Sequence, residues 1–264
     1  MLEVINLYKT FNAGTVNEKV ALNNVSLKLE KGDFVTVIGG NGAGKSTFLN
    51  VVAGVYSVDS GSVVIDGMDV TRLPEYKRAK YIGRVFQDPM MGTASTMGIE
   101  ENLALAARRG KRRGLRWGVS RRERLDYIEL LRDLGLGLEN RITSKVGLLS
   151  GGQRQAITLL MAAIQKPKLL LLDEHTAALD PKTAVKVLEL SDRIISENEL
   201  TALMVTHNMK DAIVHGNRLI MMNDGKIILD ISGDDKKNLT VEELLHKFEL
   251  ASGEEFASDK AILA

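Results

Sequence analysis

The first third of the chain alternates between apolar and polar residues, at the two-residue period of a half-buried strand. The segments that alternate, or form short apolar runs, are LEVINL, NNVSLKL, FVTVIG and YIGRVF. SVVIDGMDV predicts a hairpin with Asp66-Gly67 at its turn, because Asp-Gly suits the tight connection between two strands. The predicted strand YIGRVF, residues 81–86, ends just before Gln87.

The middle third changes to the longer period of helices, from about Glu100 to Gln165. Ser120 and Glu123 form a capping box, which predicts a helix start at this point. An apolar face follows at Leu125, Ile128, Leu131 and Leu134. Gly135 is expected to end this helix.

Strands return in the last third, at LLLLD up to Asp173 and at ALMVTH up to His207. Asp180 and Pro181 suit the N-cap and the first position of a helix between these strands. RLIMMNDGKIILD predicts a second hairpin around Asp224-Gly225. Strands that alternate with helices predict an α/β fold, in which helices cover a parallel sheet.

Two further segments complete this arrangement. The helical stretch between Gln87 and Gln165 is expected to form a subdomain inserted into the α/β core. Thr240 and Glu243 form another capping box, so a packed terminal helix is expected after them. Its apolar residues are Val241, Leu244, Leu245 and Phe248.

Composition narrows the class of protein without naming its function. The 264 residues suffice for one large domain or a domain with a subdomain, and the net charge of +1 names no partner. The absence of cysteine excludes disulfides and thiolate metal sites. Since no apolar run approaches the roughly twenty residues of a membrane span, and no signal peptide is recognisable, we expect a soluble protein whose membrane role requires a partner.

GGNGAGKST, residues 39–47, has the spacing of a phosphate-binding loop between a strand and a helix. Glycines let backbone N–H groups face phosphate oxygens, and the following helix directs its positive end at them. Lys45 is expected to reach the terminal phosphates, and the Ser46 hydroxyl to ligate magnesium. A plain glycine-rich turn is the alternative, but the order of strand, loop, Lys-Ser and helix favours phosphate.

LLLLDE, ending at Glu174, supplies the acidic complement of that loop. The apolar strand is expected to bring Asp173 to a magnesium ion through water, and Glu174 to an attacking water molecule. The alternative is that the two acids simply end a strand. The presence of a phosphate-binding loop in the same chain favours the catalytic interpretation over this one.

LSGGQ, residues 149–153, resembles a second phosphate-binding turn. Ser150 and Gln153 form a capping box, so a helix start explains part of the pattern. A helix start does not need Gly151-Gly152, however, and two glycines allow another group to approach the backbone. An exposed helix N-terminus of this composition suits an anion.

Together these motifs, in this order, resemble the ATP-binding-cassette (ABC) transporter ATPases over about residues 1–235. LSGGQ is similar to the family's signature motif, which precedes the strand LLLLDE as the family requires. The resemblance implies a P-loop NTPase (RecA-like) core with an antiparallel β subdomain and an inserted α-helical subdomain. It implies a nucleotide-binding domain at 1–240, with the helical subdomain at about 89–165, and a C-terminal helix and tail at 241–264.

The resemblance also implies ATP and Mg²⁺ as cofactors and assigns the binding residues. Gln87 matches the Q-loop glutamine, Asp180 in AALD the D-loop, and His207 in VTHN the switch histidine. Phe11 matches the aromatic residue that stacks on adenine, with Tyr8 as the alternative. The implied nucleotide-binding residues are Phe11, Gly39, Gly40, Asn41, Gly42, Ala43, Gly44, Lys45, Ser46, Thr47, Gln87, Ser150, Gly151, Gly152, Gln153 and Asp180.

By the same resemblance, two copies pair head to tail, with ATP between residues 39–47 of one copy and 149–153 of the other. Glu174 is implied to polarise the attacking water, while Lys45 and His207 stabilise charge on the γ-phosphate. The implied magnesium ligands are Ser46, Gln87 and Asp173, the last through water. The family usually has proline after the Asp-Glu pair, whereas this chain has His175, which we expect to be an exposed loop residue.

QDPMMGTASTMGIEENLALAARRG, after the Q-loop, resembles bacterial solute importers of the tryptophan/tyrosine uptake type. This implies a transport-coupled ATPase subunit on the cytoplasmic face of the cell membrane, which powers import of a small solute through a separate permease. An extracytoplasmic solute-binding protein is the further implied partner, and no nucleic acid is expected. The alternative is a soluble ABC ATPase that drives protein or cofactor assembly.

Residues 108–124 are strongly basic, with nine Lys or Arg residues against one acid, Glu123. We hypothesise that they contact anionic lipid headgroups or permease loops, with Trp117 at the interface. The alternative is a solvated basic loop.

Overall fold

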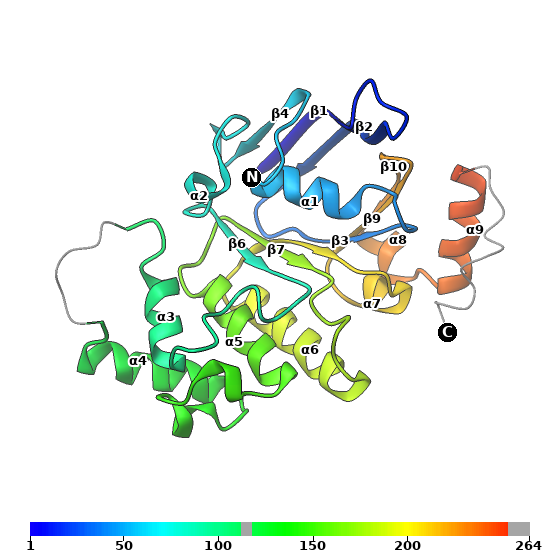
Figure 1. The fold of residues 1–264 in the computed structure, drawn as a ribbon. Helices are drawn as coiled ribbons and strands as arrows, with labels where there is room; N and C mark the ends of the chain where they lie inside the picture. The colour runs from blue at the N-terminus through cyan, green and yellow to red at the C-terminus, as the bar shows by residue number, and fades with distance from the viewer. Residues whose placement is uncertain (112–117, 253–264) are drawn as a thin grey trace. The chain divides into compact units, whose positions relative to one another are not determined.

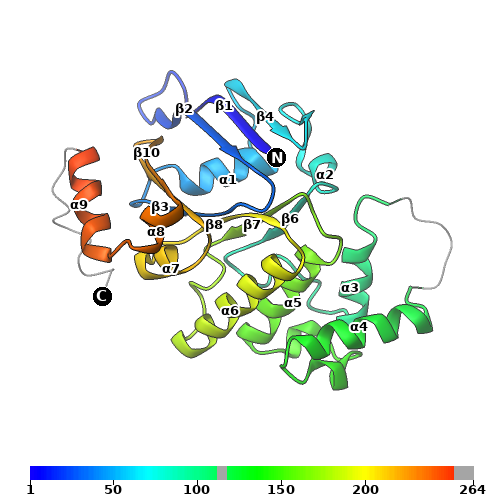
Figure 2. The same cartoon turned by 180° about the vertical axis from the view of Figure 1, so that it is seen from behind.

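The computed structural model describes residues 1–111 and 118–252 (Figures 1 and 2). The chain divides into two compact units, the first made of Met1–Arg78 with Glu199–Ala264 and the second of Ala79–Asn198. In the described residues, no helix has both the length and the apolar character that a membrane crossing requires.

The first unit contains an antiparallel sheet of four strands in the order β2-β1-β4-β5. Its strands are β1 (Leu2–Phe11), β2 (Lys19–Leu29), β4 (Ser60–Ile65) and β5 (Met68–Asp69). Leu2, Val4 and Leu7 face the core and are almost fully buried. Asp66 and Gly67 both have positive φ, which fits the tight turn predicted between β4 and β5.

The first unit also contains strands in the order β10-β9-β3-β8. These are β3 (Phe34–Ile38), β8 (Thr201–Val205), β9 (Arg218–Asn223) and β10 (Lys226–Ser232). β3 is buried along its whole length and runs parallel to both β8 and β9, as its continuous apolar sequence requires. β9 and β10 form the predicted antiparallel hairpin.

Five helices are described in the first unit: α1 (Lys45–Ala53), α2 (Glu75–Arg78), α7 (Met209–Val214), α8 (Gly233–Lys237) and α9 (Val241–Ser252). The predicted terminal helix is confirmed as α9, and Thr240 and Glu243 form its capping box. Leu244 and Phe248 of α9 are buried in an apolar cluster with Ile38.

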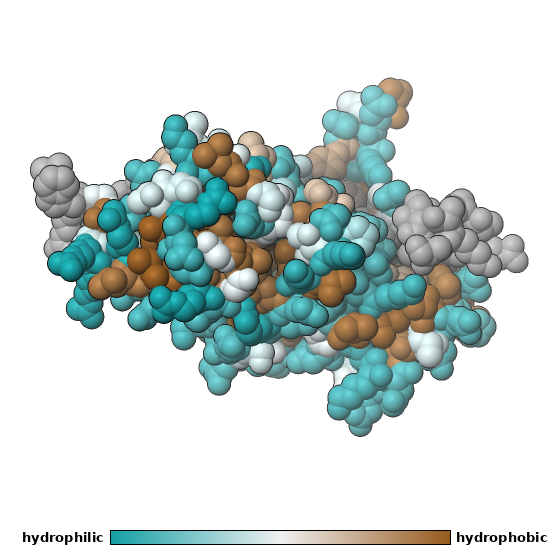
Figure 3. Space-filling model, turned by 90° about the horizontal axis from the view of Figure 1, so that it is seen from below, coloured by the Kyte–Doolittle hydropathy of each residue, from teal (hydrophilic) through white to brown (hydrophobic). Residues whose placement is uncertain are grey.

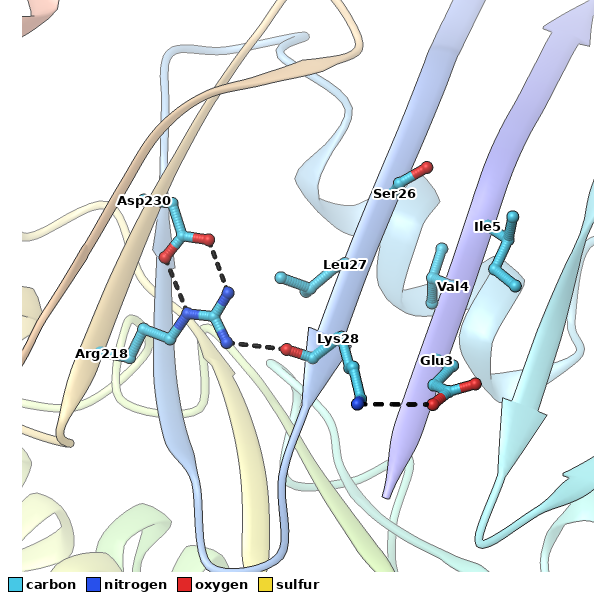
Figure 4. Close-up of a pocket in the computed structure, with 8 residues that line it drawn as sticks. All are labelled: Glu3, Val4, Ile5, Ser26, Leu27, Lys28, Arg218 and Asp230. Carbon is cyan, nitrogen blue, oxygen red and sulfur yellow. Dashed lines mark hydrogen bonds and ion pairs between the residues drawn. The ribbon is translucent and has the colours of Figure 1, made fainter.

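Arg218 links the two sheets of the first unit (Figure 4). Its guanidinium donates to both carboxylate oxygens of Asp230 on β10, and to the Lys28 carbonyl oxygen on β2 at 2.7 Å. Hydrogen bonding to Asp230 raises the pKa of Arg218 above its ordinary value. A shallow pocket lies beside this bridge, with Glu3 and Ile5 of β1 on its far side.

The second unit contains the parallel pair β6 (Ile82–Val85) and β7 (Leu169–Asp173). Its helices are α3 (Ile99–Ala107), α4 (Arg121–Asp133), α5 (Gly151–Ala163) and α6 (Pro181–Glu197). α5 packs against β6, α3 and α6. Arg124 donates twice to the Glu100 carboxylate, at 2.6 and 2.8 Å, which ties α4 to α3.

The prediction that residues 100–165 are mainly helical is confirmed, and the helix that Gly135 was expected to end is α4. Gly135 and Gly137 adopt left-handed φ values of 67° and 70°, which interrupt the helix. Only the short 3₁₀ helices Leu138–Arg141 and Val146–Leu148 follow, and Gly98 pairs with Lys145 as a β-bridge. The other predicted strands and capped helices are confirmed, within a few residues at their ends.

Candidate functional site

The glycine-rich loop lies between β3 and α1 in the first unit, and its glycines are required by close contacts. A Cβ atom on Gly39 would lie 2.2 Å from the Met222 carbonyl oxygen, and one on Gly44 would lie 2.5 Å from that of Ala21. Both glycines have positive φ, 151° and 101° respectively. The backbone of the loop is therefore fixed against β2 and β9, and no side chain larger than hydrogen fits at either position.

Lys45 turns back over this loop. Its side chain is buried, with 7% exposure, and its ammonium group donates to the carbonyl oxygens of Gly39 at 2.7 Å and Gly40 at 3.1 Å. Gly44 gives α1 no side-chain cap, and the Ser46 hydroxyl on the first turn is exposed. A helix N-terminus beside a buried ammonium group attracts an anion with several oxygens, such as a phosphate chain.

Supporting residues around the loop come from distant parts of the first unit, and the sequence patterns did not indicate that they contact it. The Gly225 N–H, at the turn between β9 and β10, donates to the Ala43 carbonyl oxygen at 3.1 Å. The Lys19 ammonium lies 3.1 Å from the position that a Cβ on Gly42 would occupy, which adds a second positive charge beside the loop. Lys19 belongs to no recognisable sequence motif, and its position at the start of β2 in the antiparallel sheet places it beside the loop.

The predicted adenine-stacking residue, Phe11, ends β1 and is partly exposed. Tyr56 contacts it edge to face, with ring centroids 5.3 Å apart, and the Lys9 ammonium lies 5.5 Å from the Phe11 centroid. Tyr56 is a residue that the sequence patterns missed, because it simply follows the end of α1. Tyr8, the alternative, is on β1 and is exposed.

His207 follows β8 at the edge of the sheet where β3 gives way to the phosphate-binding loop. Val37 and Val205 are in register, and the Thr206 N–H donates to the Val37 carbonyl oxygen at 3.1 Å. The carboxyl ends of parallel strands lie at one edge of a sheet. Lys45 begins α1 after β3 and His207 follows β8, so both residues follow strand ends at this edge. Burial raises the pKa of Asp211, on α7, while the charges of His215 and His207 oppose that shift.

The acidic pair and Gln87 occupy the corresponding strand ends in the second unit. Val85 of β6 is in register with Leu172 of β7, so Gln87 and Asp173 follow paired positions. Arg84 donates to Asp173 at 3.2 Å, and the two side chains are only 12% and 15% exposed. The Arg84 guanidinium also stacks over Phe86, at 4.6 Å from the ring centroid. This arginine was not predicted, since nothing in its local sequence marks it.

The prediction for His175 is wrong: the side chain is buried, with 2% exposure, rather than exposed in a loop. Its Nε2 atom lies 3.0 Å from the hydroxyl oxygen of Ser191 on α6. The loop folds back on α6 after β7, so the residue after Glu174 points into the second unit. The local sequence pattern did not predict this burial, because Ser191 lies sixteen residues further along the chain.

The LSGGQ segment forms the N-terminus of α5. The Ser150 hydroxyl oxygen accepts a hydrogen bond from the Gln153 N–H, and the Gln153 side-chain oxygen accepts one from the Ser150 N–H, so the predicted capping box is confirmed. A Cβ on Gly152 would lie 2.1 Å from Cγ2 of Thr183 on α6. The close contact between α5 and α6 therefore gives a structural reason for glycine at position 152, which does not depend on a bound anion.

Asp180 is the N-cap of α6, and it accepts a hydrogen bond from the Thr183 N–H at 3.1 Å. Hydrogen bonds from Thr183, chiefly from its hydroxyl, hold the pKa of Asp180 below its ordinary value. The predicted binding residues thus form two sets. Phe11, residues 39–47 and His207 belong to the first unit, and the others belong to the second.

Comparison with known proteins agrees with these motifs. Residues 22–177 match the family model described as ABC transporter. The chain is 46% identical over 252 residues to a tyrosine transport ATP-binding protein of Clostridioides difficile, covering 95% of this chain and all of that protein. It is 37% identical over 202 residues to the thiamine import ATP-binding protein ThiQ of Salmonella choleraesuis, covering 76% of this chain and 81% of that protein.

Solved structures show the same fold. The ATP-binding cassette MJ0796, solved as a dimer in a post-hydrolysis state bound to ADP and Pi, superposes with a TM-score of 0.73 at 32% identity. The match covers 88% of this chain and 98% of that one. The predicted P-loop α/β fold is therefore confirmed. The chain belongs to the ABC transporter family and is one of its ATP-hydrolysing, nucleotide-binding ATPases.

Proposed function

We propose that this ATPase powers the uptake of a small solute, of the aromatic amino acid class, through a separate membrane permease. The similarity to a tyrosine transport ATP-binding protein over that protein's whole length carries the proposal. An extracytoplasmic solute-binding protein completes the proposed system, and the ATPase lies on the cytoplasmic face of the membrane. The ThiQ and spermidine/putrescine relatives are also named as import proteins, which supports import over export.

In the proposed reaction, the phosphate-binding loop holds ATP through its backbone N–H groups, and Phe11 stacks on the adenine ring. Lys45 and His207 stabilise the charge that develops on the γ-phosphate, while Glu174 orients and polarises the attacking water. The buried ammonium of Lys45 supports this role, since it already lies within the loop.

Magnesium is the proposed ion of this reaction, and the donor set fits it. Ser46, Gln87 and Asp173 offer hydroxyl, amide and carboxylate oxygens, the hard ligands that Mg²⁺ prefers, with Asp173 acting through water. When bound, the ion neutralises charge on the phosphate oxygens. Arg84 keeps Asp173 oriented through its 3.2 Å contact.

The signature segment is proposed to act in a second copy of the chain, paired head to tail. Ser150 and the backbone of Gly151 and Gly152 then reach the γ-phosphate of the partner copy, with Gln153 beside them and Asp180 crossing the dimer. The N-terminus of α5 supports this role, because Ser150 and Gly151 are exposed there. In such a pair ATP links the copies, and its hydrolysis releases them.

Two regions of the second unit are the proposed contacts with the permease. Met90 and Met91, just after Gln87, are 47% and 70% exposed. Figure 3 shows a face on which apolar residues reach the surface in patches among hydrophilic ones.

The basic stretch 108–124 is a second proposed contact, although 112–117, with Trp117, lies outside the described residues. Of its described arginines, Arg108 pairs with Glu123 and Arg124 with Glu100, so part of this charge is already neutralised.

Uptake by cells tests the proposal. Deletion of the gene should abolish energy-dependent uptake of labelled tyrosine or tryptophan, and the wild-type gene should restore it while Glu174→Gln does not. Membrane-extracted Glu174→Gln protein held with ATP should retain a multi-spanning permease. Undiminished uptake, with only soluble partners retained, would instead support the alternative of an assembly ATPase.

A further inference from the structure

The loop between β7 and α6 carries His175 directly after Glu174, where the resemblance to the family would imply proline. Its imidazole is 2% exposed and the Ser191 side chain opposite it is 1% exposed. A polar pair at this depth is costly unless its hydrogen bonds are satisfied.

The direction of the hydrogen bond between them follows from the surroundings. The Ser191 hydroxyl lies 2.8 Å from the Val187 carbonyl oxygen, one turn earlier on α6, and donates to it. A carbonyl can only accept, and a serine hydroxyl has a single hydrogen. The contact of 3.0 Å between His175 Nε2 and Ser191 Oγ is therefore donated by the imidazole.

This hydrogen bond fastens a turn whose backbone is unfavourable by itself. Glu174 has a φ of 43°, in the left-handed region that a residue with a side chain rarely adopts. Its carbonyl oxygen accepts from the Ala177 N–H at 3.0 Å, and that of Thr176 accepts from the Leu179 N–H at 3.1 Å. Such backbone persists when the surrounding structure holds it, and His175 is the neighbouring residue whose side chain reaches α6.

The same helix contacts the signature segment. Asp180 caps α6, and Thr183 on its first turn touches Gly152 at the start of α5. An anchor on α6 therefore holds the turn of Glu174 relative to the two segments that are proposed to act across the dimer.

We propose that His175 is a positioning residue: its hydrogen bond to Ser191 holds Glu174 in the orientation that hydrolysis requires. This inference rests on the proposed role of Glu174 as the residue that polarises water. It assigns no contact with nucleotide to His175 and predicts an effect on turnover rather than on ATP binding.

The test uses the purified full-length chain and compares kcat with KM for ATP. Ser191→Ala and His175→Leu each remove the hydrogen bond, and each should lower kcat by roughly tenfold, the effect of losing one buried hydrogen bond. KM should change by less than about twofold, because the phosphate-binding loop is untouched. His175→Gln, whose amide N–H can replace the Nε2 donor, should retain most of the activity.

Matched controls distinguish an effect on the orientation of Glu174 from a general loss of protein stability. Ser196→Ala makes the same change at an exposed site on the same helix and should leave kcat unchanged. The double variant His175→Leu with Ser191→Ala should be no slower than either single one, since both remove one interaction. Additive losses, unchanged kcat in both single variants, or a glutamine variant as slow as the leucine one would overturn the proposal.

Amide hydrogen exchange of the peptide over 174–180 gives a measurement that does not depend on activity. Ser191→Ala should speed exchange there, and Ser196→Ala should not. If Glu174→Gln hydrolysed ATP as fast as the wild-type chain, the proposed role of Glu174 would fail, while equal exchange in the two serine variants would independently refute the anchor.

Discussion

The phosphate-binding loop of the first unit and the loop from Asp173 to Asp180 in the second begin alike, since each follows a buried strand and leads into a helix. They are held by different means. Backbone contacts of glycines fix the first loop, whereas the second is fixed by side chains: Arg84 on Asp173, His175 on Ser191, and Asp180 on Thr183.

This difference has a chemical reason. A loop that must present many N–H groups to phosphate needs its backbone uncovered, and any side chain would fill the space. A loop that must aim one carboxylate needs rigidity, which distributed side-chain contacts supply. Substitutions should therefore abolish function in the first loop and reduce it by degrees in the second.

The largest effect is expected from Gly44→Val. The added Cβ would lie 2.5 Å from the Ala21 carbonyl oxygen, at a φ of 101° that valine rarely adopts, so the loop must rearrange. We expect ATP affinity, measured by titration calorimetry, to fall by more than about a hundredfold. Gly118→Ala is the control, because that glycine has open space and no positive φ. If Gly44→Val kept its affinity for ATP, the phosphate-binding loop would not depend on its glycine backbone contacts, and the contrast between the two loops would be wrong.

The next effect is that of Glu174→Gln, which keeps the shape of the side chain and removes the charge that is proposed to polarise water. We expect kcat to fall by roughly a hundredfold or more, with ATP affinity almost unchanged. The variant should accumulate as a dimer with ATP, seen by light scattering, and stay monomeric with ADP. A fast-hydrolysing variant would mean that another group polarises the water.

A moderate effect is expected from Arg84→Met, which removes the contact with Asp173. The carboxylate loses its orientation, so kcat should fall by roughly tenfold and more Mg²⁺ should be needed for half-maximal activity. Arg132→Met, at an exposed position on α4, is the matched control. Equal activity of the two variants would show that Arg84 has only a structural role.

The smallest effect concerns the stability that Asp180 gives as an N-cap. Asp180→Ala should lower the unfolding temperature by roughly 2–4 °C. Because the folded-state pKa lies below the unfolded value of about 3.9, this stabilisation is present above that value and is lost as pH falls through the folded-state pKa. Thermal scans at neutral pH and near pH 3 should show the difference between the variants shrinking in acid.

The sequence predicted most of the fold because its patterns are local. Apolar alternation, Asp-Gly turns and the capping boxes of Ser120, Ser150 and Thr240 each involve neighbours within a few residues, and the structure has the corresponding strands, turns and helices. The break between α4 and α5 has a local cause too: Gly135, which the sequence predicted as the end of a helix, and Gly137 both adopt left-handed φ values.

Residues of the site that stabilise others were not predictable in this way. Arg84, Lys19 and Tyr56 obtain their positions from strand register and from chain reversal, over separations that no periodicity records. Gly152 was predicted to make room for an anion, and the contact with Thr183 gives it a further reason that only the neighbouring helix reveals.

By itself, the sequence determined that the chain is an ABC ATPase and supplied the candidate groups for ATP binding and hydrolysis, since a phosphate-binding loop, an Asp-Glu pair and a signature serine are short contiguous motifs whose chemistry depends on residue order. Only the tertiary structure decided how those groups are held. Whether His175 is exposed or buried, and whether Asp173 has a cationic neighbour, depends on which helix or strand folds back beside each residue, and long-range apolar burial determines that choice.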